Sequence, residues 1–343
     1  MEDILFLAFT ESDGTLSQAA REVLGAVREL GGTLRVALAG AQTQPAAAAL
    51  ANCGAAKFLA VTGPEFAQAR YATDAAAAEA LCRASGASVV VVPSNSRSAR
   101  VMPGVAHRLG GRVDSHITAI TADGQLNVTR WYYRQRMEAV VERAQRPWVL
   151  LLEPGCHAPY QGTGGSPQVH AVTVALAKNH QRTQVTGVRA PATDEQTIRP
   201  DAKLLFVAGA GWTKKQADGQ IHGAEAEQLI LGFLGSSGAS LGGSKSLVEQ
   251  SGEGQAVLRF MTHLNQIGQT GATPRHPKGL ATCCHGEEPH VVGWRFIHER
   301  RAVNLDANCG WARGKADVLY VADAFEVMRK VNALLKAHAA PSA

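Results

Sequence analysis

Several patterns that mark metal-binding, hydrolytic and nucleic-acid-binding proteins are missing from this chain. Its six cysteines form no CxxC pair, so neither a structural zinc site nor a ferredoxin-type cluster is indicated. A nucleophile elbow, an HExxH pair and a Walker motif are missing too. Because the basic residues form no stripe with interleaved aromatic side chains, we expect no nucleic-acid partner.

Signals for export or membrane insertion are missing as well. The segment 1–10 has acidic residues ahead of a short apolar run. A signal peptide needs a basic flank, and a membrane-spanning helix needs about 20 apolar residues. We therefore expect a protein that is not membrane-embedded and that works in the reducing cytoplasm. The net charge of +5 is too small to indicate an acidic partner.

The composition is that of a globular protein, and the length indicates two domains. Of the 343 residues, 45% are hydrophobic and 18% are charged. The segment 190–197 combines two alanines, a proline and several polar residues, which is typical of a linker. We predict an N-terminal domain over 1–190 and a C-terminal domain over 200–343.

Alternating strands and helices predict an α/β fold. Residues 4–9 are an unbroken apolar run, as expected of a buried parallel strand. An apolar helical face over 20–30 and a second predicted strand at 34–39 complete a βαβ unit, which requires a parallel sheet. Further helices are predicted at 73–85 and 99–109, and further strands at 58–61, 89–93, 126–133, 137–141, 148–152 and 169–177. The last of these is predicted to cross between the domains.

The second domain repeats this pattern around the stretch 263–317. An apolar strand at 203–208 enters a turn with Gly209 and Gly211. Helices are predicted at 224–234 and 324–337, the latter with its buried side formed by Phe325, Met328, Val331, Leu334 and Leu335. Ligands of open α/β sheets lie beyond the carboxyl ends of the strands, where backbone N–H groups hold phosphate. We therefore predict a doubly wound, Rossmann-like C-terminal domain with a phosphorylated cofactor.

A family resemblance lies in the same stretch. The residues that carry it are Gln269, Thr270, Gly271, Gly286, His290 and Asn304. In their order and spacing they resemble the C-terminal domain of electron transfer flavoprotein alpha subunits. The resemblance implies that this domain binds FAD, and that the N-terminal domain binds no cofactor and packs against a beta subunit. It implies an electron carrier rather than a substrate-transforming enzyme, with dehydrogenases as donors and a quinone oxidoreductase as the acceptor.

The resemblance also suggests roles for single residues. The Thr270 hydroxyl would bind a flavin heteroatom or a phosphate oxygen, and His290 would lie beside the pyrimidine edge of the flavin. A cationic imidazole there would stabilise a negatively charged flavin. Asn304 and Asp317 match positions around the adenosine half, and Asp306 lies near the same strand end.

Several positions depart from the family pattern. His285 stands where the family has a serine before the phosphate turn, and Glu287 and Glu288 add negative charge beside it. Lys245 stands in place of an arginine over the flavin. It keeps the positive charge but lacks the planar guanidinium group that stacks and donates several hydrogen bonds. Ala210 replaces a second arginine. These departures leave open a non-redox paralogue that kept the fold but lost or weakened FAD binding.

Three clusters have a structural and a functional interpretation. A metal centre built from Cys283, Cys284, His285 and His290 is disfavoured, because adjacent strand residues point to opposite faces. Helix capping is favoured over phosphate binding for Ser94, Asn95 and Ser96. A solvated face is favoured over a docking patch for Arg130, Arg134, Arg136, Arg143 and Arg146.

Overall fold

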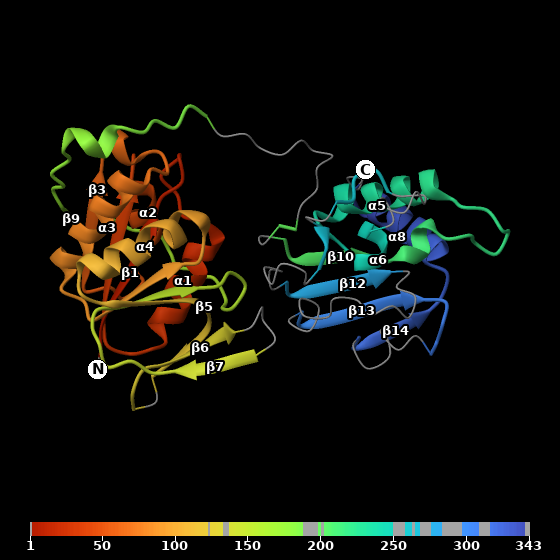
Figure 1. Cartoon of the computed structure of the whole chain (residues 1–343), viewed down its shortest axis with the longest axis horizontal. Helices are drawn as coiled ribbons and strands as arrows, with labels where there is room; N and C mark the ends of the chain where they lie inside the picture. Colours follow the sequence, from red (N-terminus) through yellow and green to blue (C-terminus); the bar gives the residue numbers. More distant parts are fainter. Residues whose placement is uncertain are drawn as a thin grey trace. The chain divides into compact units, whose positions relative to one another are not determined.

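The computed structural model describes residues 2–122, 124–132, 137–187, 198–199, 202–249, 258–262, 265–267, 276–282, 297–308 and 316–339. The chain divides into two compact units, which Figure 1 shows. Unit 1 consists of Met1–Tyr133 and Met137–Val188, and unit 2 consists chiefly of Arg189–Ala343.

Within the described residues, unit 1 contains a nine-stranded, mostly parallel sheet, called sheet A here. Its strand order is β7-β6-β5-β8-β4-β1-β2-β3-β9. The strands are β1 (Asp3–Phe9), β2 (Thr33–Gly40), β3 (Lys57–Thr62), β4 (Val89–Pro93), β5 (Arg112–Thr121), β6 (Asn127–Tyr132), β7 (Met137–Val141), β8 (Trp148–Leu152) and β9 (Val169–Ala171). Strand β6 pairs antiparallel with both of its neighbours, β5 and β7. The predicted α/β class is confirmed.

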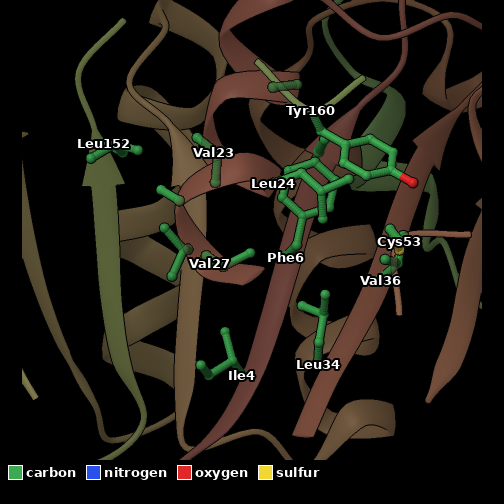
Figure 2. Close-up of a cluster of buried hydrophobic side chains, with 14 of the residues drawn as sticks. Ile4, Phe6, Val23, Leu24, Val27, Leu34, Val36, Cys53, Leu152 and Tyr160 are labelled. Atoms are coloured by element: carbon green, nitrogen blue, oxygen red, sulfur yellow. The ribbon is translucent and has the colours of Figure 1, made fainter. Parts of the chain in front are cut away.

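Helices cover both faces of sheet A, and this explains why its central strands are apolar throughout. They are α1 (Gln18–Arg28), α2 (Gln44–Ala49), α3 (Tyr71–Ser85) and α4 (Ser96–Arg108). Successive residues of a strand point to opposite faces. Ile4 and Phe6 therefore pack in one hydrophobic cluster with α1, which Figure 2 shows, while Leu5 and Leu7 pack in a second cluster with α3 and α4.

One sequence prediction for unit 1 was wrong, and one helix was missed. Helix α2 was not predicted, because its alanine-rich turn carries no apolar periodicity. The strand predicted at 169–177 ends at Ala171 and pairs with β3 inside unit 1 instead of crossing between domains. The alternation of Val172, Val174 and Leu176 has another cause, since these side chains pack against the cluster beneath α3 and α4.

The basic residues near the β5–β7 strands are held by carboxylates of unit 1. Asp114, 2% exposed, accepts hydrogen bonds from Arg130 Nη1 at 2.8 Å, from Arg143 Nη2 at 2.9 Å and from Trp148 Nε1 at 2.9 Å. Arg146 pairs with Glu2. Three of the five predicted surface arginines therefore form internal ion pairs. The other two, Arg134 and Arg136, lie outside the described residues.

Unit 2 contains a parallel five-stranded sheet, called sheet B, in the part that the structure describes. Its order is β11-β10-β12-β13-β14. The strands are β10 (Leu204–Ala208), β11 (Ser240–Gly243), β12 (Lys278–Thr282), β13 (Glu299–Asn304) and β14 (Val318–Val321). In chain order this is 2-1-3-4-5, the flavodoxin-like variant of the doubly wound fold.

Two long helices pack together against sheet B. Helices α5 (Gly223–Ser237) and α8 (Ala324–Ala339) bury Ile230, Phe233, Phe325 and Met328 in one cluster with β10. The helix predicted at 224–234 is confirmed, and it buries Ala226, Leu229, Ile230 and Phe233. On α8 the prediction was wrong at Leu334, which is 63% exposed.

Candidate functional site

The carboxyl edge of sheet A is occupied by contacts within unit 1. Strands β1 and β4 lie side by side and their connections leave in opposite directions, which is where doubly wound sheets bind ligands. Arg97 fills this place. It donates to Asp74 at 2.8 and 2.7 Å and to the Phe66 carbonyl oxygen at 2.9 Å, and it lies 4.4 Å above the Phe9 ring.

The polar turn after β4 serves the fold of unit 1. The Asn95 side chain accepts from Ser98 N at 2.8 Å and caps α4, which confirms the capping interpretation for this residue. The Ser94 hydroxyl donates to Glu153 Oε1 at 2.9 Å. These contacts leave little for a phosphate to bind at this edge.

The corresponding place in sheet B is the junction of β10 and β12. In the order 2-1-3-4-5 the ligand crevice lies beyond the carboxyl ends of these two strands. The turn after β10 begins a short 3-10 helix, η3 (Ala210–Thr213), instead of the long helix of a Rossmann turn. Gly209 N donates to the Thr282 carbonyl oxygen at 2.8 Å and ties this turn to the end of β12.

Below the turn the junction is filled by a buried indole. Trp212 has no exposed surface, donates from Nε1 to Thr282 Oγ1 at 2.8 Å and packs 4.5 Å from the Phe325 ring. Thr282 Oγ1 in turn donates to the Val207 carbonyl oxygen at 3.1 Å. The carboxyl edge of sheet B therefore has a rigid, fully packed base.

Three of the predicted cofactor residues lie at this edge, namely Lys245, Asn304 and Asp306. Lys245 follows β11, opens the short helix α6 (Lys245–Glu249) and pairs with Glu249 at 3.4 Å. Asn304 is the last residue of β13, is 3% exposed and accepts from Asp306 N at 3.0 Å. They share one edge because all the strands of sheet B run parallel.

Asp317 lies at the opposite edge. It precedes β14, so it is at the amino end of the sheet, and it accepts from Arg300 N at 2.7 Å. Its carboxylate also pairs with the Arg300 guanidinium at 2.8 Å. The hydrogen bonds from Arg300 hold the pKa of Asp317 below its usual value. The structure does not bring Asp317 together with the other candidates.

The remaining predicted site residues lie outside the described part of the chain. They are Gln269, Thr270, Gly271, His285, Gly286 and His290, and the same holds for Glu287, Glu288, Cys283 and Cys284. Among the residues that are described, no three His, Cys, Asp or Glu side chains gather closely enough to hold a metal ion.

A small cleft lies at the same edge, between η3 and the amino end of α8. It is lined by Gly211, Gln216, Asn304, Leu305, Asp323 and Phe325, among others. Asp323 Oδ1 accepts from Phe325 N at 2.7 Å and from Glu326 N at 3.1 Å, so a carboxylate already caps α8. The end of α8 is therefore a poor place for phosphate, whose negative charge Asp323 would repel.

One residue of the edge was missed by sequence reasoning. Gln266 bridges to Gly243, the last residue of β11, and is 2% exposed. Within the part of the chain that the structure describes, neither its Oε1 nor its Nε2 has a hydrogen-bond partner. Such orphaned buried groups are rare and call for an explanation. No spacing or motif distinguishes Gln266 from its neighbours, so the sequence carried no signal for it.

Comparison with known protein families finds a match. A family model described as "Electron transfer flavoprotein domain" matches residues 4–178, slightly more than half of the chain. The matched segment lies in unit 1 and ends before sheet B begins. No curated protein matches the chain. Among the described helices, none is long and apolar enough to cross a bilayer.

Proposed function

The chain belongs to the electron transfer flavoprotein family, and on this premise we propose that it is the alpha subunit of a heterodimeric electron transfer flavoprotein, with FAD bound in unit 2. The observation that carries the cofactor assignment is the gathering of Lys245, Gln266 and Asn304 at one edge of a doubly wound sheet. The orphaned carboxamide of Gln266 supports it further, because an orphaned buried group fits a ligand that supplies its missing partners.

The side chains of the edge have separable roles in this proposal. FAD supplies the redox chemistry when it is bound, and the protein supplies position and charge. Lys245 brings a positive charge to the end of β11, where it would attract the negatively charged cofactor in competition with Glu249. Asn304 is held by its bond to Asp306 N and presents its amide at the end of β13. Asp317 has no part in this arrangement.

The buried base of the edge keeps these groups in place. Trp212, Thr282 and Phe325 are packed and hydrogen-bonded below the strand ends. A preorganised polar site costs little rearrangement when charge changes on a bound cofactor. The sheet would therefore act as a rigid holder that tunes the cofactor's potential.

The proposed partners follow from the same assignment. A beta subunit would pack against unit 1, where Met137 and Val140 of β7 are 56% and 72% exposed. Exposed apolar side chains on an edge strand are typical of a surface that a partner covers. Dehydrogenases would donate electrons to the heterodimer, and a quinone oxidoreductase would accept them.

A second candidate is a non-redox paralogue without FAD. It is favoured by the buried Ala210, which offers no charge, and by the ion pair that engages Lys245 with Glu249. The two candidates differ in a property that is simple to observe, since a flavin-loaded protein is yellow.

The test is co-expression of the chain with its beta subunit, followed by absorption spectroscopy and FAD titration. We expect a flavin spectrum, and Lys245→Gln should weaken FAD binding about tenfold, the scale of one charge-assisted contact. Lys278→Gln is the matched control, because Lys278 forms a similar exposed pair with Glu299, but at the amino edge of sheet B. A colourless heterodimer that takes up no added FAD would exclude the proposed function and favour the paralogue.

A further inference from the structure

Cationic side chains gather on one side of sheet A in unit 1. Helices α3 and α4 pack against each other on this side (Figure 1), and the short 3-10 helix η2 (Lys178–Gln181) packs against α3. The exposed cations of these elements, and of the residue that follows η2, are Arg83, Arg100, Arg108, Lys178 and Arg182. Within α3, α4 and η2, all of them described, Glu79 is the one carboxylate that is not fully buried.

Glu79 holds two of these arginines in place. It accepts from Arg83 Nη2 at 2.9 Å and from Arg108 Nη1 at 3.3 Å. Arg83 Nη2 also donates to the Arg108 carbonyl oxygen at 3.2 Å. The two arginine side chains are 57% and 40% exposed. One carboxylate thus positions two guanidinium groups, and the three charges together leave a net positive charge at the surface.

Arg100 extends this surface along α4. The buried side of α4 is apolar and consists of Val101, Met102, Val105 and Ala106. Arg100 and Arg108 are exposed on the other side, about 12 Å apart along the helix axis. In the part of the chain that the structure describes, Arg100 forms no ion pair. Asp74, whose titration Arg100 influences, is fully buried and bonded to Arg97 at 2.8 and 2.7 Å.

The kind of cation and the place of Glu79 favour a protein as the binding partner. Four of the five cations are arginines, whose planar forks match carboxylates and which are enriched at protein interfaces, where lysine is depleted. Glu79 would repel a dense polyanion such as RNA or an anionic bilayer. A protein can instead place a neutral or basic group against Glu79 and carboxylates against the arginines.

We propose that the outer sides of α3 and α4 form a docking surface for an acidic protein, whose carboxylates bind Arg83, Arg100 and Arg108. The inference does not depend on the cofactor, because all of these residues lie in unit 1. The surface also shares no residue with the edge strand β7, where the beta subunit is proposed to pack. An attraction of this kind weakens as the salt concentration rises.

The test is a titration of the full chain with a fluorescein-labelled helical peptide that carries glutamates one helical turn apart. Wild type should bind the peptide, and Arg100→Glu should weaken binding by about tenfold or more, because a charge-assisted contact becomes a repulsion. Binding should also weaken with added salt, and it should be lost when the peptide carries glutamines in place of its glutamates.

Arg21→Glu is the matched control. Arg21 is exposed on α1, which covers the opposite face of sheet A, and its reversal changes the net charge by the same amount. Both arginines are exposed, so each variant should keep its free energy of unfolding in urea within about 0.5 kcal/mol of wild type. Arg100→Gln, which removes the charge without reversing it, should give an intermediate loss of peptide binding.

Two further probes test the class of partner. They are single-stranded RNA and vesicles of phosphatidylserine and phosphatidylcholine. If either binds more tightly than the peptide and loses this binding in Arg100→Glu, the surface serves a nucleic acid or a membrane and the inference is wrong. The inference is also wrong if wild type does not bind the peptide, or if Arg21→Glu weakens binding as much as Arg100→Glu does.

Discussion

Replacing Asp114 by Asn should destabilise unit 1 by about 3 kcal/mol, the low end of the range for breaking a buried ion pair. The carboxylate accepts from Arg130, Arg143 and the indole of Trp148. An asparagine would present an N–H₂ donor to one of these donors. It would also leave the guanidinium groups of Arg130 and Arg143 without the negative charge that the carboxylate supplies. The low end applies because the arginine side chains are 18% and 35% exposed and retain some solvation.

Hydrogen exchange of the full chain measures this effect in unit 1 alone. Amides of β5 and β8 that exchange through opening of unit 1 should exchange about 100-fold faster in Asp114→Asn. Glu79→Gln is the control, because Glu79 forms partly exposed pairs with Arg83 and Arg108 and should change stability by less than about 1 kcal/mol.

The pH dependence provides a second check on Asp114. Burial by itself raises its pKa, but the hydrogen bonds from Arg143 and Trp148 and the two arginine charges outweigh burial, so the pKa is lowered. A lowered pKa stabilises the fold above the unfolded value of about 3.9, and this stabilisation is lost as the pH falls through the folded value. The difference between wild type and Asp114→Asn should therefore shrink below about pH 4. A variant within about 0.5 kcal/mol of wild type at pH 7 would refute the reasoning.

Three further predictions concern other contacts. The hydrogen bond to Glu153 raises the pKa of His116. NMR titration should place this pKa above about 6.5, and the stabilisation from the contact should be lost as the pH rises through the raised value. Glu153→Gln should remove the shift, and an unshifted pKa in wild type would contradict the contact. Asp323→Ala removes the cap of α8 and should cost about 1 kcal/mol, seen as faster exchange in the first turn of the helix, and unchanged exchange there would argue against the cap. Trp212→Phe removes the hydrogen bond to Thr282 and leaves a gap. The free energy of unfolding of unit 2, measured in urea, should therefore fall by about 2 kcal/mol. A fall of less than about 0.5 kcal/mol would show that the buried base is not rigid.

Much of the fold could be predicted because buried parallel strands are apolar throughout. Strands β4 and β8 have no polar residue, and β1 has none after Asp3, so the place of these strands was readable from the sequence. Helix α2 and the end of β9 could not be found in this way. The first has no amphipathic period, and the second depends on which side chains face α3 and α4.

The site was less predictable because it depends on direction and partners, which a sequence does not display. Lys245 and Asn304 end at the same edge because their strands run parallel. Asp317 was suggested by the resemblance, although it immediately precedes β14 and is therefore at the amino edge. Gln266 stands out only when the burial and the missing hydrogen bonds of its carboxamide are known.

The most direct test of the central proposal is hydrogen exchange of the full chain with its beta subunit, measured with and without FAD. We predict slower exchange at the carboxyl edge of sheet B, in segments 209–216, 244–249, 265–267 and 304–308, and little change around Asp317 at the amino edge. Uniform exchange in the two states, or protection confined to sheet A, would contradict the assignment of the cofactor to unit 2.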